Sequence, residues 1–566
     1  MKKERLLINR KKYAFALVEV LLGVALFSLS ISALIGTLIY GQESTVLSGD
    51  RVRASYLAEE GIEALRNIKD ASFSNLTDGT WGLTTTGNQW NLNGSSDANG
   101  EFTRQTQIST IDADTKRATT TVSWTQNLQR IGSVVLDTYF TNWQAPVAAA
   151  SRTMMVYSKS TVIPYYRIWD GSSWEAEGAA TSVNNSIQYL VLKFAKNRDE
   201  AILGTLDSTG DIRVQVWNGS SWGTTTLLAN VGLTNDAYRG FDIDYETSGD
   251  RAIVVYNNAN AVDPSYRIWN GSSWSSPVVI ADPPTSGVPF WIELERNPLS
   301  SSNEISMFFS DSNVDVYGMA WNGSTWGTMG TAAVWDATSA VSSKKAIDVA
   351  YEQNSGRAMF MWGDSVATDQ YYRIWNGTTL TAATLLDIPA SGGIANWVEL
   401  VSRPNSNELM YGVLDAGADL NTRKWSGSAW DTVTQHPEHD AACENITSKN
   451  FDIVYETYSG NEAKAWLMWG DGATVSHRQW LGSGWGSITS LETTESDDTS
   501  YIKLHANLST GAVFAGIYQG VISAADDILE HHLSVGGTAW SSKFTIWGGP
   551  ISAEPVMFRI EMDSER

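Results

Sequence analysis

Hydrophobic residues form one long run near the start of the chain. Between Phe15 and Gly41 the only charged side chain is Glu19. From Val20 to Tyr40 there are 21 uncharged residues, which at about 1.5 Å per residue span the roughly 30 Å hydrocarbon core of a bilayer. Apolar positions then recur from Ala54 to Ile68 with the spacing of one helix face. The pattern predicts one helix from about residue 16 to 70, membrane-borne in its first half and amphipathic in its second.

Beyond this helix the period of the pattern changes from 3.6 to 2. A stretch rich in Gly, Asn and Thr runs through Gly100, and alternating segments follow at 100–110, 116–126 and 131–143. Alternation of this kind is typical of antiparallel strands with one buried face. The sequence therefore predicts a small α+β domain over residues 15–145, followed by a linker over residues 146–151.

Residues 152–566 repeat a short motif of the form WNGSSW. Its copies begin at Trp169, Trp217, Trp269, Trp321, Trp375, Trp425 and Trp480, with a degenerate eighth copy from Leu533. Successive copies lie 48 to 55 residues apart, and each repeat contains four β-branched or aromatic runs separated by turn residues. Four short strands at a period near 50 residues are typical of a β-propeller blade. The predicted fold class is mainly β, with an eight-bladed propeller after the long helix.

The two ends of the repeat array complement each other. The first repeat begins with TMMVYSKS, which matches the second strand of the others, and VMFRIEMD from Val556 matches the strand that the first repeat lacks. The carboxyl terminus is therefore predicted to complete the first blade and close the ring, which would pair otherwise open strand edges. A different blade count and two smaller barrels are the alternatives.

The charge and the cysteine content of the chain exclude some classes of protein. The formal net charge is −23, although the first 14 residues carry six basic side chains and one acid. An acidic surface repels phosphate backbones, so we expect no nucleic-acid partner. The single cysteine, Cys443, permits no disulfide within the chain and no cysteine cluster for a metal. The basic leader before the apolar run places the first residues in the cytoplasm and the bulk of the chain outside.

A carboxylate at the start of an apolar run is costly in lipid and suggests a partner. The string from Ala14 to Glu19 (AFALVE) resembles the processing site of type IV pilins and type II secretion pseudopilins. The resemblance implies that residues 1–14 are a leader, and that prepilin peptidase cuts between Ala14 and Phe15 and methylates Phe15. Glu19 would then neutralise the amino terminus of a neighbouring subunit. The family usually has Gly at Ala14 and Thr at Ala16, and a plain anchor or a cleaved secretory signal is the alternative.

The repeated tryptophans have two interpretations. Indole faces stack on sugars, and a ring of blades multiplies weak sites, so the first tryptophan of each motif is a candidate ligand contact, as the resemblance to Trp-rich lectin-like propellers implies. These candidates are Trp169, Trp217, Trp269, Trp321, Trp375, Trp425 and Trp480. The alternative is packing between neighbouring blades, which is the commoner reason for a residue present in nearly every repeat.

Two further groups have weaker signals. Asp242, Asp348 and Asp452 share one position in alternate repeats and could hold a metal or a ligand hydroxyl, but a turn or strand-edge hydrogen bond is the ordinary role. His436 and His439 lie in the sequence HPEHD, which has a metal-ligand spacing and is otherwise an exposed polar loop. We therefore expect no metal, no cofactor and no catalytic residues.

These observations predict a minor or tip subunit of a pilus or pseudopilus that displays a propeller outside the cell for adhesion or for binding a ligand, such as a glycan. Its expected partners are prepilin peptidase, other pilin-like subunits and, before assembly, the inner membrane. The alternatives are a membrane-anchored enzyme that acts on surface glycans, which would need two carboxylates about 5 to 10 Å apart, and a structural component of a type II secretion-like pseudopilus.

Overall fold

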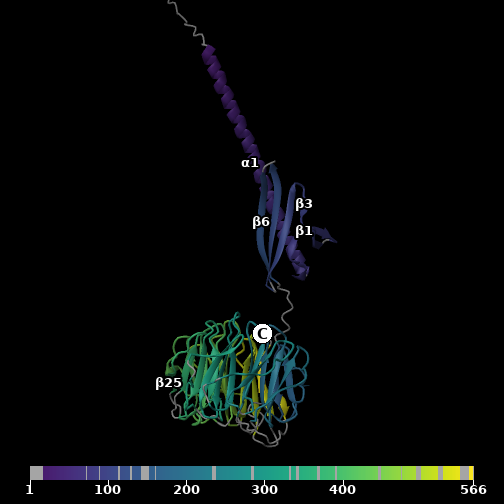
Figure 1. Cartoon of the computed structure of the whole chain (residues 1–566). Helices are drawn as coiled ribbons and strands as arrows, with labels where there is room; N and C mark the ends of the chain where they lie inside the picture. Colours follow the sequence, from purple (N-terminus) through teal and green to yellow (C-terminus); the bar gives the residue numbers. More distant parts are fainter. Residues whose placement is uncertain are drawn as a thin grey trace, which may run out of the picture. The chain divides into compact units, whose positions relative to one another are not determined.

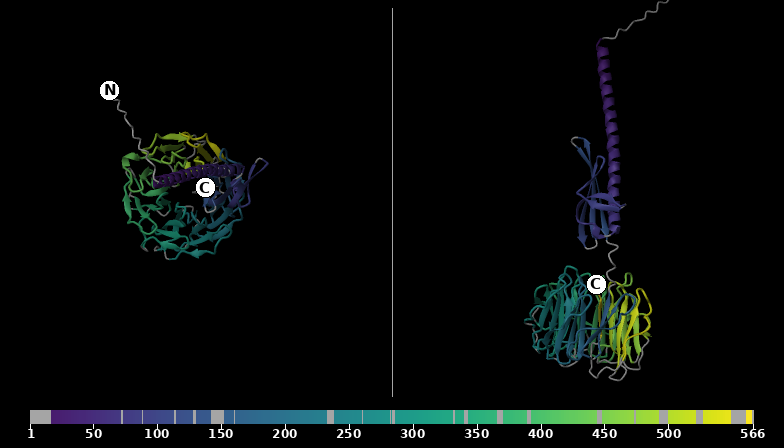
Figure 2. Two further views of the ribbon diagram at one scale, coloured as in Figure 1. Left: turned by 90° about the horizontal axis from the view of Figure 1, so that it is seen from above. Right: turned by 90° about the vertical axis from the view of Figure 1, so that its right-hand side faces the viewer.

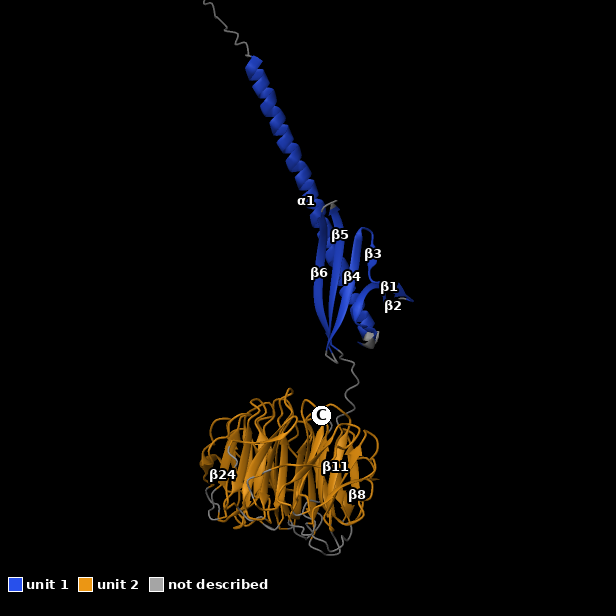
Figure 3. Ribbon diagram, viewed as in Figure 1, with its two compact units in different colours: residues 1–149 blue, residues 150–566 orange. Residues whose placement is uncertain are grey.

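The computed structural model divides the chain into two compact units, residues 1–149 and residues 150–566 (Figure 3). The structure describes residues 17–71, 73–87, 89–112, 115–127, 130–141, 152–159, 161–232, 238–259, 261–281, 283, 286–330, 333–339, 343–365, 370–388, 392–443, 448–472, 474–491, 499–520, 527–548 and 560–564. Each unit is described by itself.

The first unit is built on helix α1 (Leu17–Ala71), which confirms the predicted long helix (Figure 1). By length and composition α1 can cross a membrane, and no part of its most apolar 18-residue window is buried. Its second half is amphipathic, and Ala54, Ala58 and Leu65 are fully buried against the sheet of this unit. The helix therefore changes from an uncovered apolar rod to one wall of a small core.

The sheet of the first unit has the strand order β2-β1-β4-β5-β6, and β3 also pairs with β4. Its strands are β1 (Gly79–Thr86), β2 (Gln89–Asn93), β3 (Asp97–Asn99), β4 (Phe102–Asp112), β5 (Thr115–Asn127) and β6 (Arg130–Thr141). Strands β4, β5 and β6 confirm the three predicted strands over the residues described. Strands β1 to β3 were not predicted. Arg104 joins helix to sheet through ion pairs of 2.9 Å with both Glu60 and Asp97.

The second unit is a propeller-like array of small antiparallel sheets, eight among the residues described. Sheet 1 is β37 (Ile560–Ser564), β7 (Thr153–Ser158), β8 (Pro164–Trp169) and β9 (Gly178–Ala179); sheet 2 is β10 (Ile187–Phe194), β11 (Ala201–Asp207), β12 (Asp211–Trp217) and β13 (Thr226–Asn230); sheet 3 is β14 (Phe241–Tyr245), β15 (Ala252–Tyr256), β16 (Ser265–Trp269) and β17 (Val278–Val279); sheet 4 is β18 (Pro289–Arg296), β19 (Glu304–Asp311), β20 (Val316–Asn322) and β21 (Trp326–Thr328).

The remaining sheets follow the same plan. Sheet 5 is β22 (Ile347–Tyr351), β23 (Ala358–Gly363), β24 (Gln370–Trp375) and β25 (Thr384–Leu386); sheet 6 is β26 (Ala395–Ser402), β27 (Leu409–Asp415) and β28 (Leu420–Trp425); sheet 7 is β29 (Phe451–Tyr455), β30 (Ala465–Asp471), β31 (Thr474–Trp480) and β32 (Thr489–Leu491); sheet 8 is β33 (Thr499–Ala506), β34 (Val513–Gln519), β35 (Asp527–Leu533) and β36 (Phe544–Gly548).

The first strand of each sheet contacts the first strand of the next. These contacts run from β37 to β10, β14, β18, β22, β26, β29 and β33, and β33 contacts β37 again. The left view in Figure 2 shows the sheets of this unit from above, following one another in order of sequence colour from teal to yellow. Strand β37 pairs antiparallel with β7, from Ile560 opposite Tyr157 to Ser564 opposite Thr153. The predicted completion of the first repeat by the carboxyl terminus is confirmed.

Candidate functional site

The repeat motif forms the hairpin between the third and fourth strands of a sheet. Trp269 lies directly opposite Trp274, and the same pairing recurs at Trp169 with Trp174 and at Trp425 with Trp430. The connection is therefore four residues long, as the facing of the two tryptophans requires. Within it the Asn270 side chain accepts hydrogen bonds from the backbone N–H groups of Ser272 and Ser273, each at 2.9 Å. Gly271 adopts a φ of 92°, which explains the Asn-Gly pair.

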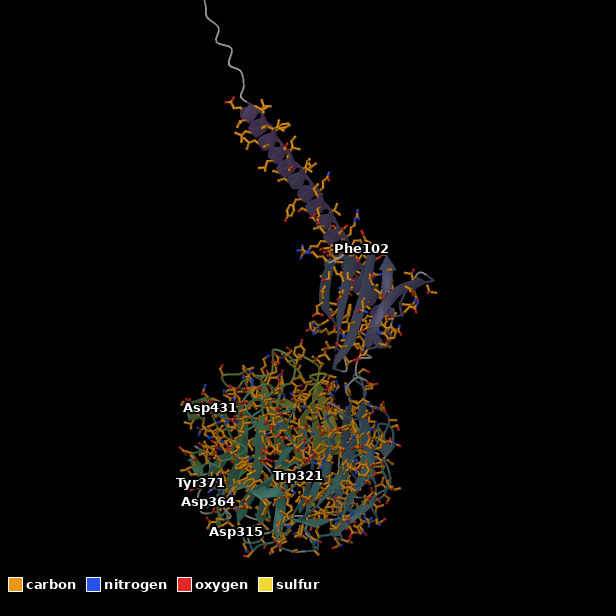
Figure 4. All side chains as sticks on the ribbon, turned by 45° about the horizontal axis from the view of Figure 1, so that its top comes forward. Phe102, Asp315, Trp321, Asp364, Tyr371 and Asp431 are labelled. Atoms are coloured by element: carbon orange, nitrogen blue, oxygen red, sulfur yellow. The ribbon has the colours of Figure 1, made fainter. Side chains whose placement is uncertain are left out.

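The first tryptophans of the motif lie between sheets. Six of the seven candidates are buried, with exposed fractions from 0% to 7%, and Trp269 is half-buried. Tyrosines of the preceding sheet pack against three of them: Tyr166 against Trp217, Tyr266 against Trp321 and Tyr372 against Trp425, with ring centroids 5.6, 5.6 and 6.0 Å apart. Trp321 is labelled in Figure 4. Because a buried indole has no free face for a sugar, this geometry favours packing over ligand contact.

An ionic clamp reinforces this packing. The buried Glu246 carboxylate of sheet 3 accepts a hydrogen bond of 2.7 Å from the indole N–H of Trp321 in sheet 4. Glu246 also pairs with Arg251, and Arg251 donates a hydrogen bond of 2.7 Å to the carbonyl of Gly323 in the same hairpin. Glu352 binds Trp425 in the same way at 2.8 Å. Glu246 and Glu352 of the recurring Tyr-Glu pairs therefore hold the hairpin of the following sheet, whereas Glu456 accepts hydrogen bonds from Trp466 and Gln479 of its own sheet.

Glu246→Ala should lower the free energy of unfolding by roughly 2–3 kcal/mol, because the Trp321 N–H then loses its acceptor and Arg251 loses its carboxylate. Denaturant unfolding of the full chain, followed by tryptophan fluorescence, measures the change. Glu175→Ala, at an exposed position, is the matched control and should change the free energy by less than about 0.5 kcal/mol. Equal midpoints for the two variants would contradict the clamp.

The recurring aspartates form strand-edge hydrogen bonds, as expected for their ordinary role. A carboxylate oxygen of Asp242 accepts a bond of 2.8 Å from the backbone N–H of Leu294, which lies in the next sheet. Asp348 and Asp452 accept bonds of 2.7 Å from Leu400 and Leu504, again in the next sheet. No group of three or more His, Cys, Asp or Glu side chains placed to hold a metal occurs within the described part of the chain. These aspartates therefore join adjacent first strands.

The same aspartates belong to a larger lattice of charges along the first strands. Lys345 lies 3.4 Å from Asp348 and 3.3 Å from Glu399, and Lys449 lies 3.2 Å from Glu399 and 3.1 Å from Asp452. Arg239 pairs with Glu293 at 2.6 Å, and Lys503 lies 3.6 Å from Glu561. All of these contacts join neighbouring first strands or the residues just before them. We call this set the axial lattice.

Electrostatics in the axial lattice are set by burial and by its cations. Burial by itself would raise the pKa of Glu399, but Lys345 and Lys449 outweigh it and hold that pKa below its ordinary value. Burial raises the pKa of Asp348 and of Asp242 above the ordinary value, with Lys345 and Arg239 opposing the shift. Removing one partner of such a buried pair leaves an uncompensated charge, which is strongly destabilising.

The lattice cations were missed at the sequence level, although a signal exists. Arg239, Lys345 and Lys449 each stand three residues before a recurring aspartate, and each lies within 4 Å of that aspartate. A basic residue three positions before a repeated aspartate therefore predicts an ion pair between the two.

Two cavities adjoin the axial lattice. One of about 590 Å³ is lined by residues that include Lys193, Glu295 and Asp563, and one of about 290 Å³ is lined by residues that include Arg239 and Lys345. Both are lined by Glu399, Lys503 and Glu561. We call the two together the axial pocket. The first has exposed residues, Asn405 and Leu508, on its rim, so the axial pocket opens to solvent on that side.

The histidines of the HPEHD sequence are buried, with exposed fractions of 6% and 4%, so the expected exposed loop is wrong. A chain of hydrogen bonds uses their ring nitrogens. Arg478 donates to His439 Nδ1 at 3.2 Å, and His439 Nε2 and His436 Nδ1 each lie 2.8 Å from the Thr422 hydroxyl. His436 Nε2 lies 2.7 Å from the Asp431 carboxylate. Donors and acceptors balance when both rings are neutral, so these histidines join sheets 6 and 7.

Acid should therefore weaken this junction. Burial, the Arg478 guanidinium and His436 lower the pKa of His439 well below its ordinary value. The unfolded chain then binds a proton near pH 6.5 that the folded chain does not, so stability falls as the pH drops below about 6.5, by up to about 1.4 kcal/mol per pH unit. The difference in unfolding free energy between wild type and His439→Gln should shrink from pH 7 to pH 5. A pH-independent difference would contradict this.

The amino-terminal candidates divide between described and undescribed residues. Ala14 and Phe15, the expected processing residues, lie outside the described residues. Glu19 lies in the first turn of α1, where the structure leaves its side chain exposed. It begins the apolar run from Val20, none of which is buried up to Tyr40.

No family model matches the chain, and no curated protein matches it. Among solved structures, the BP39L lectin of Burkholderia pseudomallei has a TM-score of 0.47 at 11% identity, covering 64% of this chain and 100% of the lectin. The six-bladed β-propeller lectin of Aleuria aurantia has a TM-score of 0.32 at 13% identity, covering 50% and 94%. The dihydro-heme d1 dehydrogenase NirN has a TM-score of 0.46 at 8% identity, covering 73% and 74%. At TM-scores below 0.5 none of these transfers a function.

Proposed function

We propose that the chain is a pilin- or pseudopilin-like subunit, minor or at the tip of its filament, that carries a propeller head outside the cell. The observation that carries the proposal is the uncovered apolar half of α1, continuous with an amphipathic half that packs on a small sheet. So large an apolar surface needs a cover, either lipid or the helices of neighbouring subunits. Glu19 at the start of this apolar surface suits a helix that moves from the lipid bilayer to a position between the helices of neighbouring subunits.

The proposal includes the processing step. Cleavage between Ala14 and Phe15 would leave a new amino group four residues before Glu19. In a filament that amino group and the Glu19 carboxylate of a neighbouring subunit would share one apolar environment, where opposite charges need each other. Prepilin peptidase and other pilin-like subunits are the partners this requires. A plain membrane anchor would need neither the carboxylate nor the cut.

The head is proposed to be one closed ring of eight blades. Support comes from the contact of each first strand with the next, including β33 with β37, and from the pairing of β37 with β7. A ring of blades leaves only the short outer strands of the sheets as edges. Its large size favours a minor or tip position, because a head of residues 152–566 would crowd every neighbour in a packed shaft.

A glycan remains the proposed class of surface ligand, but at different residues. The second tryptophan of the hairpins is half-buried, whereas the first is buried in every one of these hairpins except that of Trp269; the second tryptophans are Trp174, Trp222, Trp274, Trp326, Trp430 and Trp485. Partly exposed indoles can stack on a sugar. Hydrolysis of a bound glycan would favour the enzyme alternative, for which the carboxylates of the axial pocket are the candidates.

Shearing filaments from cells and probing them for the full chain tests the assembly half. The chain should be recovered with the filaments and should be absent from them in cells that lack prepilin peptidase. If the chain is recovered only in the membrane fraction of both strains, α1 is a plain membrane anchor. Binding of the full chain in detergent to a glycan array tests the ligand half, with Trp222→Ala as the variant and the buried-position variant Trp217→Phe as its control.

A further inference from the structure

The wall of the axial pocket is not uniform around the ring. Six of the first strands place equivalent side chains at one level, two positions beyond Glu561, Val191, Glu293, Glu399, Asp452 and Lys503, and in sheet 8 this side chain is His505. Sheets 1, 2 and 4 contribute Asp563, Lys193 and Glu295, whereas sheets 6 and 7 contribute Val401 and Val454. Strand alternation gives all of them the same orientation toward the pocket. At this level the lining side chains are charged in sheets 1, 2 and 4 and aliphatic in sheets 6 and 7, while Glu399 and Asp452 of sheets 6 and 7 also line the first cavity.

Lys193 differs from the other lysines near the pocket. Lys345 and Lys449 each have carboxylate oxygens within 3.4 Å. With the described residues, the Lys193 ammonium group forms no side-chain hydrogen bond and no ion pair within 4.0 Å, and only longer-range charge interactions act on it. Burial would lower its pKa, but Asp244, Glu295 and Asp563 outweigh that effect and hold its pKa above the ordinary value. Its ammonium group therefore stays charged, lines the cavity and is available to an anion.

The acidic groups of the same wall, Glu295 and Asp563, both act electrostatically on the Lys193 ammonium group. Asp563 is held in place because its carboxylate accepts a hydrogen bond of 2.8 Å from the backbone N–H of Phe194, directly after Lys193. Glu295 is half-buried and lines the cavity beside Arg296. A ligand that reaches this wall therefore meets one fixed positive charge between fixed negative charges.

The chemistry of the pocket excludes a sugar-stacking site. The aromatic side chains among its lining residues are Tyr455 and His505, and Tyr455 is only 2% exposed. Val401 and Val454 instead present aliphatic surface, which suits a branched side chain rather than a sugar face. A volume of about 590 Å³ lies within the range of small-molecule sites.

We propose that the axial pocket binds a short aliphatic peptide as its zwitterion, with the carboxylate on Lys193, the ammonium group on Glu295 and Asp563, and the side chains against Val401 and Val454. Each group of the ligand therefore has a complementary group in the wall of the pocket. The site is separate from the tryptophan hairpins and from α1, so the inference goes beyond the proposed function and does not depend on it.

Calorimetric titration of the full chain in detergent with the tripeptide Leu-Ala-Leu tests the proposal. Wild type should bind it, and Lys193→Met should weaken binding by roughly 10- to 100-fold, the effect of one charge-assisted hydrogen bond. Lys193→Arg keeps the charge and should stay within a few-fold of wild type. The same peptide acetylated at one end and amidated at the other should bind at least tenfold more weakly than the free peptide.

Three results would overturn the proposal. They are the absence of binding by Leu-Ala-Leu to folded wild type, equal affinity in Lys193→Met, and equal affinity for the capped and free peptides. The capped peptide is tested on wild type, so this result decides the proposal even if a Lys193 variant fails to fold. Lys193→Met should leave recovery in filaments unchanged, which separates failure of this site from failure of the assembly proposal.

Discussion

Glu19→Ala should reduce recovery of the chain in sheared filaments by 100-fold or more while leaving its insertion in the membrane intact. In lipid the Glu19 carboxylate costs free energy, so replacing it with alanine does not impair membrane insertion. In a filament the carboxylate would neutralise the amino terminus of a neighbour. Loss of one partner of a buried ion pair costs about 3–5 kcal/mol, and each 1.4 kcal/mol is a factor of ten.

Glu43→Ala is the matched control for this experiment. Glu43 lies on the same helix, is exposed, and follows the apolar run, so its loss should leave recovery within about twofold. Quantitative immunoblots of sheared and membrane fractions give both numbers. If Glu19→Ala enters filaments as well as wild type does, the carboxylate has no assembly role and α1 is an inert anchor.

Removal of residues 560–566 should lower the free energy of unfolding of the propeller by roughly 5 kcal/mol or more. The truncation deletes β37, and with it the buried side chains of Ile560 and Met562, at about 2–5 kcal/mol each. It also removes the hydrogen bond of 2.9 Å between Ser564 and Thr153 and leaves β7 as an open edge. Tryptophan fluorescence reports this unit, because 21 of the 25 tryptophans lie from Trp169 onward.

A shorter truncation serves as the control. Removing residues 565–566 alone leaves every residue of β37 in place and should change the denaturation midpoint little. Equal midpoints for the two truncated chains would mean that β37 adds no stability. The closure of the first sheet would then be a contact without a structural role.

Much of the fold could be predicted because it repeats or follows a simple period. The 3.6-residue spacing along α1, the four runs of each repeat and the complementary ends of the array all follow from local patterns. The short strands β1 to β3 could not be predicted, because they form in a Gly-, Asn- and Thr-rich stretch with little alternation. The pairing of β1 and β3 with β4, and of β2 with β1, supplies what local propensity does not.

The sites were harder to predict, because sequence repetition does not report exposure. The motif tryptophans are candidates for ligand contact by sequence, but the structure buries six of the seven, three of them against tyrosines of the preceding sheet. The axial pocket is assembled from single residues of sheets far apart in sequence, and the equivalents of Lys193 in sheets 1, 4, 6 and 7 are Asp563, Glu295, Val401 and Val454. Such a site can be located only once the fold places the first strands side by side.

Amino-terminal mass spectrometry of the chain released from the cell surface tests the central claim most directly. The account predicts a mature chain that begins at Phe15 with a methylated amino group and retains Glu19 at its fifth position. A surface chain that still carries residues 1–14, or one cut after the apolar run, would contradict it.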